Sequence, residues 1–518
     1  MRLFKKLSGL WQGRPPALLF WAFALIYAAG SFWGMPSAMT PALDSISPLG
    51  PLAFVAKYRQ VDITYVYPAV HQILQLAVYA AALLGGKLFG AVGAISGAWP
   101  YGFRDPSGMF TFLLLLSNWI AAGMGALLLR ALWRMRPDPG ASQWFAVPLI
   151  GLSGVYAYYT RTANMDIPYL FWMVLAWHQI WRHLTEPAAA SVRRLLLAGL
   201  FSALSFGSKD QASTIVFGFG VLLLVFTPGG VSGWLPRLRQ ASVFSAAMAV
   251  CYAVFAIAPH PARWWYHVRF VTQNPAVHIL PETPDGWWGQ ILLLERCYLR
   301  LHHILTYAGL PLAAIGAVVL WRLGRRRELA LLLVPALTYY LFVVARVRAP
   351  EDRYMLPLAL PFALLAGSAI GALGRWHAAG KALGAGVLAA QVVFSLLPVT
   401  YCQMFDTKRD LARAIGSIVA PGTAIAVHDM QTMHYPNRDV YERYQLMLWP
   451  GQSIVPPSSH VANLLGAPDP NVRYVLRGQP SPPPEGNWTF AGAWTFPAWI
   501  KSHVHVAAVH EYYLYQRR

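Results

Sequence analysis

Residues 195–225 read LLLAGLFSALSFGSKDQASTIVFGFGVLLLV, and their only charges, Lys209 and Asp210, stand side by side near the middle. In lipid only a helix satisfies its own backbone hydrogen bonds over such a run, because the strands of closed barrels alternate polar and apolar residues. The stretch therefore predicts two membrane helices that are joined by a charged hairpin.

The same pattern continues through most of the chain. Of its 518 residues 56% are hydrophobic and 12% are charged, whereas soluble domains carry about 25% charged residues. The first apolar run starts at Pro15 and has no small-residue cleavage site, so we expect a permanent helix there and not a removed signal peptide. The charges separate twelve candidate helices, at 16–35, 64–86, 107–130, 141–159, 166–181, 194–208, 211–228, 241–259, 301–321, 329–346, 354–373 and 382–400.

Basic residues decide how many of these helices span the membrane. If the helix at 64–86 lies along the outer interface, the inner loops carry eighteen basic residues against three acidic ones. If that helix spans, every later basic loop faces outside, against the positive-inside rule. We therefore predict eleven spans, a cytoplasmic N-terminus and a large external loop at 36–106, with an interfacial helix inside it.

After residue 400 the composition changes. Residues 406–419 have the pattern of an amphipathic helix, and 423–427 and 472–476 have the pattern of short strands. The predicted fold is an all-α polytopic membrane domain at 1–400, followed by an extracytoplasmic α/β domain at 401–518.

Charge and cysteine content exclude other classes. The net charge of +20 does not indicate nucleic-acid binding, because the basic residues sit in short loops between apolar runs, as in cytoplasmic loops that face anionic lipid. Cys251, Cys297 and Cys402 are scattered, so they form neither a disulfide framework nor a zinc motif.

Acids on the predicted outer side are candidates for chemistry. Asp44, the first acid after the first helix, suits a general base that accepts a proton from a hydroxyl or amine; the alternative is an ordinary loop carboxylate. Asp62 is a second acid on this side, and it could simply pair with Arg59, three residues before it. Asp166, two residues after Asn164, could orient a substrate or cap its helix. One acid and one amide are too few to define a metal site, so a divalent metal stays open and no other cofactor is indicated.

Cations on the same side are the more informative signal, because the positive-inside rule disfavours them there. Lys209 suits a phosphate ligand, or else pairs with Asp210 in a simple hairpin. Arg346, Arg348 and Arg353 also suit a phosphate, unless they pair with neighbouring acids, Glu351 and Asp352. The segment 260–300 is expected to be a long external loop whose His267 and tryptophans suit a sugar or lipid head group, or an interfacial aromatic belt.

The order of these features resembles the GT-C superfamily of membrane glycosyltransferases, above all the protein O-mannosyltransferases and the aminoarabinose transferases of lipid A. The similarity extends over the whole chain. It rests on Asp44, Tyr67-Pro68-Ala69-Val70-His71, Asp166, Lys209 and the Arg353-Tyr354-x-x-Pro357 motif, in that order.

The resemblance implies a polyprenyl-phosphate sugar donor, carried in the membrane lipid, and an enzyme that transfers its sugar. It implies Asp44 as the general base and Asp166 as a second catalytic carboxylate. The implied donor-phosphate site consists of Lys209, Arg348, Arg353 and Tyr354. The implied substrate cavity is lined by Asp62, Tyr67, His71, Arg161, Asn164 and His267.

The acceptor, a lipid, a glycan or a protein, stays open. Asp44 is followed by Ser45 where the nearest families often have paired acids, and Pro68 by Ala69 where they have a proline pair. We expect a bacterial inner (plasma) membrane protein. A transporter or flippase of lipid-linked sugars is the alternative, although it should show paired repeats and broken midplane helices. A structural or assembly protein would not need the outer arginines.

Overall fold

The computed structural model describes residues 17–32, 68, 70–94, 102, 104–230 except 187 and 189, 233–259, 261–273, 282–405, 407, 410, 414, 417–418, 424–428, 453–455, 473–477, 488–506 and 511–518. The chain divides into two compact units. The first comprises Met1–Ala28, Tyr65–Val78 and Trp119–Leu397; the second comprises Ala29–Thr64, Tyr79–Asn118 and Pro398–Arg518. The helices α4 (Val70–Leu88) and α5 (Pro106–Trp133) contribute to both.

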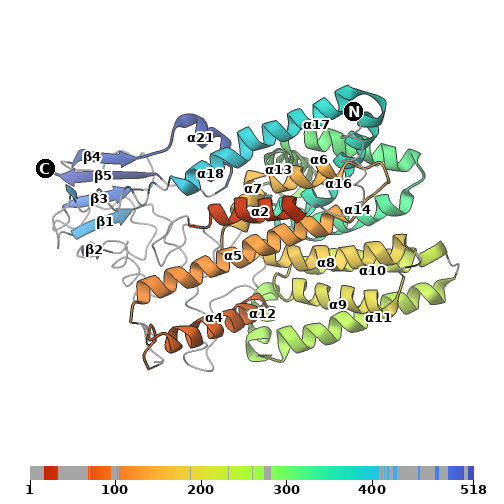
Figure 1. Ribbon diagram of the computed structural model, residues 1–518, viewed down its shortest axis with the longest axis horizontal. Coiled ribbons are helices and arrows are strands. Elements are labelled where there is room, and N and C mark those ends of the chain that lie inside the picture. The colour runs from red at the N-terminus through yellow and green to blue at the C-terminus, as the bar shows by residue number, and fades with distance from the viewer. Residues whose placement is uncertain are drawn as a thin grey trace. The chain divides into compact units, whose positions relative to one another are not determined.

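The first unit is a bundle of helices. In Figure 1, α8, α9, α10 and α11 run beside one another, and each contacts its neighbours. The helices of this unit are α2 (Ala17–Ala29), α6 (Gln143–Gly151), α7 (Gly154–Thr160), α8 (Asp166–Thr185), α9 (Val192–Phe206), α10 (Ala212–Val225), α11 (Trp234–Tyr252), α12 (Pro261–Gln273), α13 (Gly286–Arg322), α14 (Arg326–Tyr339), α15 (Ala345–Val347), α16 (Asp352–Trp376) and α17 (Ala378–Gln391). A 3₁₀ turn, η2 (Pro228–Gly230), follows α10, and the π-helical segments η3 (Ala253–Ile257), η4 (Tyr340–Val344) and η5 (Val392–Leu396) continue α11, α14 and α17. α18 (Leu397–Met404) follows η5 and belongs to the second unit from Pro398 on.

Six of the described helical segments are long and apolar enough to cross a membrane. They are Thr111–Trp133, Trp234–Ile257, Gly286–Arg322, Arg326–Val347, Asp352–Arg375 and Ala378–Met404. Two shorter helices, Ala17–Ala29 and Ala212–Val225, are also apolar. The chain is therefore a mostly helical membrane protein, and the count of eleven spans stays a prediction.

Small residues let the central helices approach closely. α16 is the most buried of the six segments and packs along α13. A Cβ atom on Gly316 of α13 would lie 1.8 Å from the carbonyl oxygen of Leu365 in α16. A Cβ atom on Gly371 of α16 would lie 1.9 Å from the carbonyl oxygen of Gly140, in the turn before α6. Backbone contact of this kind is typical of helix packing in membranes.

Two predicted boundaries were wrong. The segment 260–300, predicted as a loop, contains α12 and the first part of α13, which begins at Gly286; the part of α13 after the kink at Thr306 agrees with the helix predicted at 301–321. Glu295, Arg296 and Arg300 interrupt the apolar run, and run length therefore placed the start of the helix too late. The helix predicted at 141–159 is two helices, α6 and α7, and Ser153 caps the second by accepting a hydrogen bond from the Tyr156 amide.

The second unit contains a five-stranded mixed sheet with the order β2-β1-β3-β5-β4. β1 (Ala424–His428) pairs in parallel with β2 (Ser453–Val455) and β3 (Tyr474–Arg477). β5 (Tyr512–Arg517) pairs antiparallel with β3 and with β4 (Trp488–Trp494), and α21 (Ala498–His503) lies between β4 and β5 in the chain. Val475, Trp488 and Tyr515 form a buried cluster on this sheet.

The small sheet in the C-terminal region confirms the two predicted strands, which are displaced by one or two residues. The predicted amphipathic helix at 406–419 lies largely outside the described residues. The domain boundary at residue 400 stays a prediction.

Candidate functional site

Three of the predicted site residues, Asp44, Asp62 and Tyr67, lie outside the described residues. Their roles stay predictions. The remaining predicted residues all belong to the first unit.

A buried ion pair stands at the centre of the site. The Lys209 Nζ atom donates a hydrogen bond of 2.6 Å to Asp166 Oδ1, and the two side chains are only 2% and 3% exposed. The alternative that Lys209 pairs with Asp210 is therefore wrong. Two residues 43 positions apart, both selected from the sequence, are in direct contact.

Local structure turns both side chains inward. Lys209 follows the end of α9, where its amide donates to the Ser205 carbonyl. The Ser205 hydroxyl donates to the Tyr169 carbonyl, at 2.8 Å, and thereby ties α9 to α8. Asp166 is the first residue of α8, and its carboxylate accepts the hydrogen bond from Lys209 there.

Asn164 supports the start of α8. Its Oδ1 atom accepts a hydrogen bond of 2.9 Å from the Asp166 amide, and its Nδ2 donates to the Thr162 hydroxyl at 2.8 Å. Met165 occupies the N-cap position, so the alternative reading of Asp166 as the cap is wrong. Asn164 satisfies the backbone there, and the Asp166 carboxylate is available for Lys209.

Aromatic rings connect Lys209 to the predicted arginine cluster. Lys209 Nζ lies 5.3 Å from the centre of the Tyr169 ring and 5.6 Å from that of Tyr354. The Arg353 guanidinium lies 4.9 Å from the centre of the same Tyr354 ring. All of these distances are within the range of cation–π interaction. Two cations that are 144 positions apart in the sequence therefore meet at one ring.

The arginines have acidic partners. Arg353 Nε lies 2.6 Å from a carboxylate oxygen of Glu351, as the local-pairing alternative predicted. Arg348 Nη1 lies 2.5 Å from Asp285 Oδ1, an acid that the sequence pattern does not connect with it. Arg348 has a φ of 55°, the left-handed region, and its carbonyl accepts from the Glu282 amide. Arg353 therefore lies at the ring beside Lys209, whereas Arg348 pairs with Asp285.

His267 contacts Asp210, the residue that follows Lys209 in the chain. Its Nε2 atom is 2.9 Å and 3.0 Å from the two carboxylate oxygens of Asp210. A carboxylate only accepts hydrogen bonds, so Nε2 is the protonated nitrogen in this contact. The hydrogen bond attaches α12 to the hairpin between α9 and α10.

The remaining two predicted cavity residues are buried. The Arg161 guanidinium donates 2.8 Å to the Ile26 carbonyl and thereby attaches the end of α7 to α2. His71 lies in the first turn of α4, and burial lowers the pKa of its imidazole to about 4, so the ring is neutral at pH 7.

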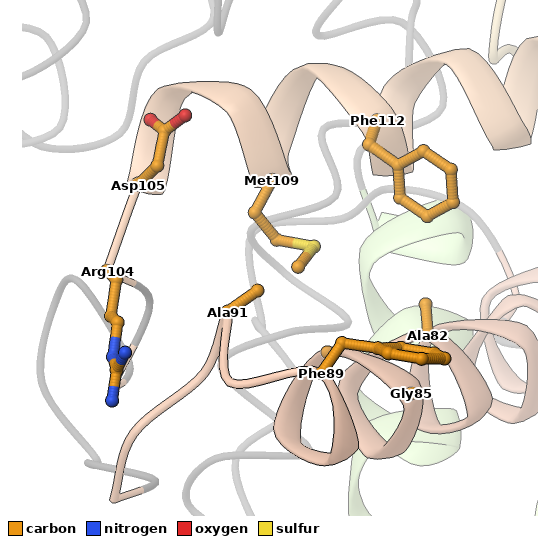
Figure 2. A pocket seen from close by; sticks show the side chains of 9 residues that line it. Ala82, Gly85, Phe89, Ala91, Arg104, Asp105, Met109 and Phe112 are labelled. Atoms are coloured by element: carbon orange, nitrogen blue, oxygen red, sulfur yellow. The ribbon is translucent and has the colours of Figure 1, made fainter.

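Among the residues that the structure describes, no three His, Cys, Asp or Glu side chains are grouped closely enough to hold a metal. A pocket of about 530 Å³ lies in the second unit, and none of the predicted site residues lines it. Figure 2 shows Met109 and Phe112 of α5 facing Phe89 and Ala82, with Arg104 and Asp105 at one end. Its mostly apolar wall suits a hydrocarbon chain better than a phosphate.

Sequence reasoning missed Tyr169 as a member of the site, and it named Asp210 and Glu351 only as local partners of neighbouring cations. Tyr169 lies three residues after Asp166 and therefore on the same helix face, which was the one available signal for it. Asp210 was read only as a partner for Lys209, since nothing in the spacing indicates His267 from another helix.

No protein-family model matches the chain. Among curated proteins it is similar to the undecaprenyl phosphate-alpha-4-amino-4-deoxy-L-arabinose arabinosyl transferase of Pseudomonas aeruginosa, with 28% identity over 296 residues, 54% of this chain and 47% of the relative. The chain thus spans about half the length of the curated relatives that it matches.

Solved structures give weaker likenesses. Crystalline ArnT from Cupriavidus metallidurans bound to undecaprenyl phosphate has a TM-score of 0.47 and 12% identity over 96% of this chain and 97% of that chain. The S. cerevisiae protein O-mannosyltransferase Pmt1–Pmt2 complex bound to the sugar donor has a TM-score of 0.34 and 18% identity, over 48% of this chain and 34% of that chain. The curated match confirms the predicted resemblance to membrane glycosyltransferases.

Proposed function

We propose that this chain, which resembles the lipid-phosphate-dependent glycosyltransferases of the GT-C superfamily, transfers a sugar from a polyprenyl-phosphate donor to an acceptor at the outer face of the membrane. The observation that carries this proposal is the buried Lys209–Asp166 pair beside the Tyr354 ring, with Arg353 on the same ring. The name of the curated relative indicates undecaprenyl phosphate as the lipid and 4-amino-4-deoxy-L-arabinose as one candidate sugar.

The Lys209 ammonium suits a phosphate ligand even while it is paired. An ammonium has three N–H donors, and Asp166 Oδ1 accepts one of them. We propose that a phosphate oxygen accepts another of these N–H groups when the lipid donor binds. Asp166 then orients the ammonium and neutralises part of its charge when no ligand is present, because a lone buried cation would be costly.

Arg353 supplies a second cation. Its guanidinium carries five N–H groups in a planar fork, a shape that suits a phosphate, and its Nε atom lies 2.6 Å from Glu351. The Tyr354 ring lies within cation–π distance of both cations. Arg348, predicted for the same role, would have to leave Asp285 to take part.

The proposed reaction is a single displacement. An acceptor oxygen or nitrogen attacks the anomeric carbon and loses its proton to Asp44, while the bond from that carbon to the phosphate oxygen breaks. The phosphate leaves with the electron pair, and Lys209, Arg353 and Arg348 stabilise its charge. Asp166 positions Lys209, and Asn164, His71, Arg161, His267, Asp62 and Tyr67 are assigned to the substrate cavity.

The proposed orientation follows from the basic loops. The N-terminus lies in the cytoplasm, and the C-terminal region lies outside a bacterial inner membrane. A lipid donor reaches the site from the bilayer, and its sugar lies in the external cavity. The acceptor is an unidentified lipid, glycan or protein, and no nucleic acid takes part.

Binding of undecaprenyl phosphate to the purified protein in lipid nanodiscs tests the proposal. Lys209→Met is combined with Asp166→Asn, because a single change would leave Asp166 buried without a partner. We expect this double variant and Arg353→Ala each to bind about ten- to a hundredfold more weakly, since a charge-assisted hydrogen bond contributes about 1.5–3 kcal/mol.

Arg296→Ala is the matched control. Its guanidinium is 53% exposed and lies 3.9 Å from Glu282, so wild-type affinity is expected. Wild-type affinity in the Lys209 and Arg353 variants as well would show that these cations serve local pairing only and would remove the proposed phosphate site.

A further inference from the structure

The long helix α13 changes direction at Thr306. Its φ of 61° and ψ of 170° lie outside the helical region, and a β-branched residue adopts a positive φ only when its surroundings enforce it. The Gln391 amide donates 2.7 Å to the Ile304 carbonyl, and the Ser395 hydroxyl donates 3.4 Å to the His303 carbonyl. Side chains of α17 and η5 therefore satisfy the carbonyls at the kink and set the direction of the segment 286–305.

This segment is joined to the start of α16. His303 Nδ1 lies 3.0 Å from Asp352 Oδ1, and Arg300 Nη1 lies 3.9 Å from Asp352 Oδ2. Both members of the shorter contact are mostly buried, with side chains 11% and 6% exposed. A carboxylate only accepts, so His303 donates through Nδ1.

Asp352 is the first residue of α16, and the next two residues, Arg353 and Tyr354, belong to the proposed phosphate site. The first turn of a helix lacks intrahelical partners for its N–H groups, so side-chain contacts strongly influence its position. A shift of about 1 Å in a positioned group can change a rate by about a hundredfold. An anchor at Asp352 therefore acts directly on the two residues that follow.

We infer that His303 is a positioning residue: through Asp352 it holds the first turn of α16, so that Arg353 and Tyr354 face the same lipid phosphate as Lys209. This inference rests on the proposed function, because it needs the phosphate at that place. It assigns a role to a histidine that lies 50 residues before Arg353 in the sequence and acts on it through one carboxylate. Arg300 contributes a longer contact to the same carboxylate.

Three variants test the inference by their affinity for undecaprenyl phosphate in nanodiscs. His303→Ala removes the donor to Asp352 and should weaken binding about tenfold, which corresponds to about 1.4 kcal/mol. His303→Asn places an amide nitrogen near the position of Nδ1 and should restore affinity to within about threefold of wild type. Arg296→Ala, on the exposed face of the same segment, should bind as wild type does.

A purely structural role for His303 predicts different results. It would lower the unfolding midpoint of His303→Ala without a specific loss of affinity in the folded fraction, and His303→Asn would give no rescue. If His303→Ala does not fold, His303→Ala/Asp352→Asn replaces it, because that pair leaves no buried unpaired carboxylate. Weak binding by the folded double variant supports positioning, and wild-type affinity overturns it.

The two proposals fail in different ways. Full affinity in His303→Ala, together with weak binding in Lys209→Met/Asp166→Asn, overturns the positioning role and leaves the phosphate site in place. Full affinity in both variants overturns the phosphate site and the positioning role together.

Discussion

Lys209→Met alone should be strongly destabilising, and the reason is the burial of its partner. The two side chains are 2% and 3% exposed and 2.6 Å apart. Removing one member of a buried pair leaves an uncompensated charge, at a cost of about 3–5 kcal/mol in the free energy of unfolding. Lys209→Met/Asp166→Asn leaves no lone charge, so it should recover most of that loss.

Unfolding in mixed micelles with increasing sodium dodecyl sulfate, followed by circular dichroism, measures both variants. Arg182→Met is the matched control, because Arg182 and Glu186 form an exposed helical pair at 2.7 Å, with side chains 37% and 43% exposed. Its loss should be at most about 0.5 kcal/mol. Equal stabilities for Lys209→Met and the double variant would refute the reasoning, because no energetic coupling would then exist between the two charges.

Three further predictions concern the base, the helix packing and the orientation. Asp44→Asn should keep donor binding and lower the rate of sugar transfer by about a hundredfold or more, the scale of general-base catalysis; a wild-type rate would remove Asp44 from the mechanism. Gly316→Ala should lower the free energy of unfolding by about 1–3 kcal/mol, because its Cβ would lie 1.8 Å from a backbone oxygen of α16. Gly220→Ala, where a Cβ meets open space, should be neutral or stabilising, and thermal unfolding compares the two variants. In a cysteine-free background, an impermeant thiol reagent applied from outside should label Trp265→Cys but not Arg325→Cys, and labelling of the latter in sealed cells would contradict the predicted orientation.

Much of the membrane fold was predictable because hydrocarbon permits few structures. Uncharged runs located the helices at α5, α8, α9 and α10 within a few residues. The prediction was wrong for the part of α13 before the kink at Thr306, where Glu295, Arg296 and Arg300 lie on a helix and not in a loop. Charges mark the end of an apolar run, but a helix can continue past them.

Individual residues of the site were predictable, and their partners were not. Asp166 and Lys209 were noticeable because charges between apolar helices are rare. Their contact depends on how α8 packs against α9, which sequence spacing does not determine. The same limit explains why Asp210 was considered as the partner of Lys209. It also explains why Arg348 was grouped with Arg353, although the structure pairs Arg348 with Asp285.

The fate of the bond between sugar and phosphate tests the proposed transfer most directly. Proteoliposomes that contain the protein receive undecaprenyl phosphate linked to isotope-labelled 4-amino-4-deoxy-L-arabinose, together with a membrane extract as the source of acceptors, and mass spectrometry follows the lipid and the label. We predict free undecaprenyl phosphate and a labelled acceptor with wild-type protein, and neither product with Lys209→Met/Asp166→Asn. Movement of the intact lipid-linked sugar between leaflets, with its bond unbroken, would contradict sugar transfer and identify a transporter instead.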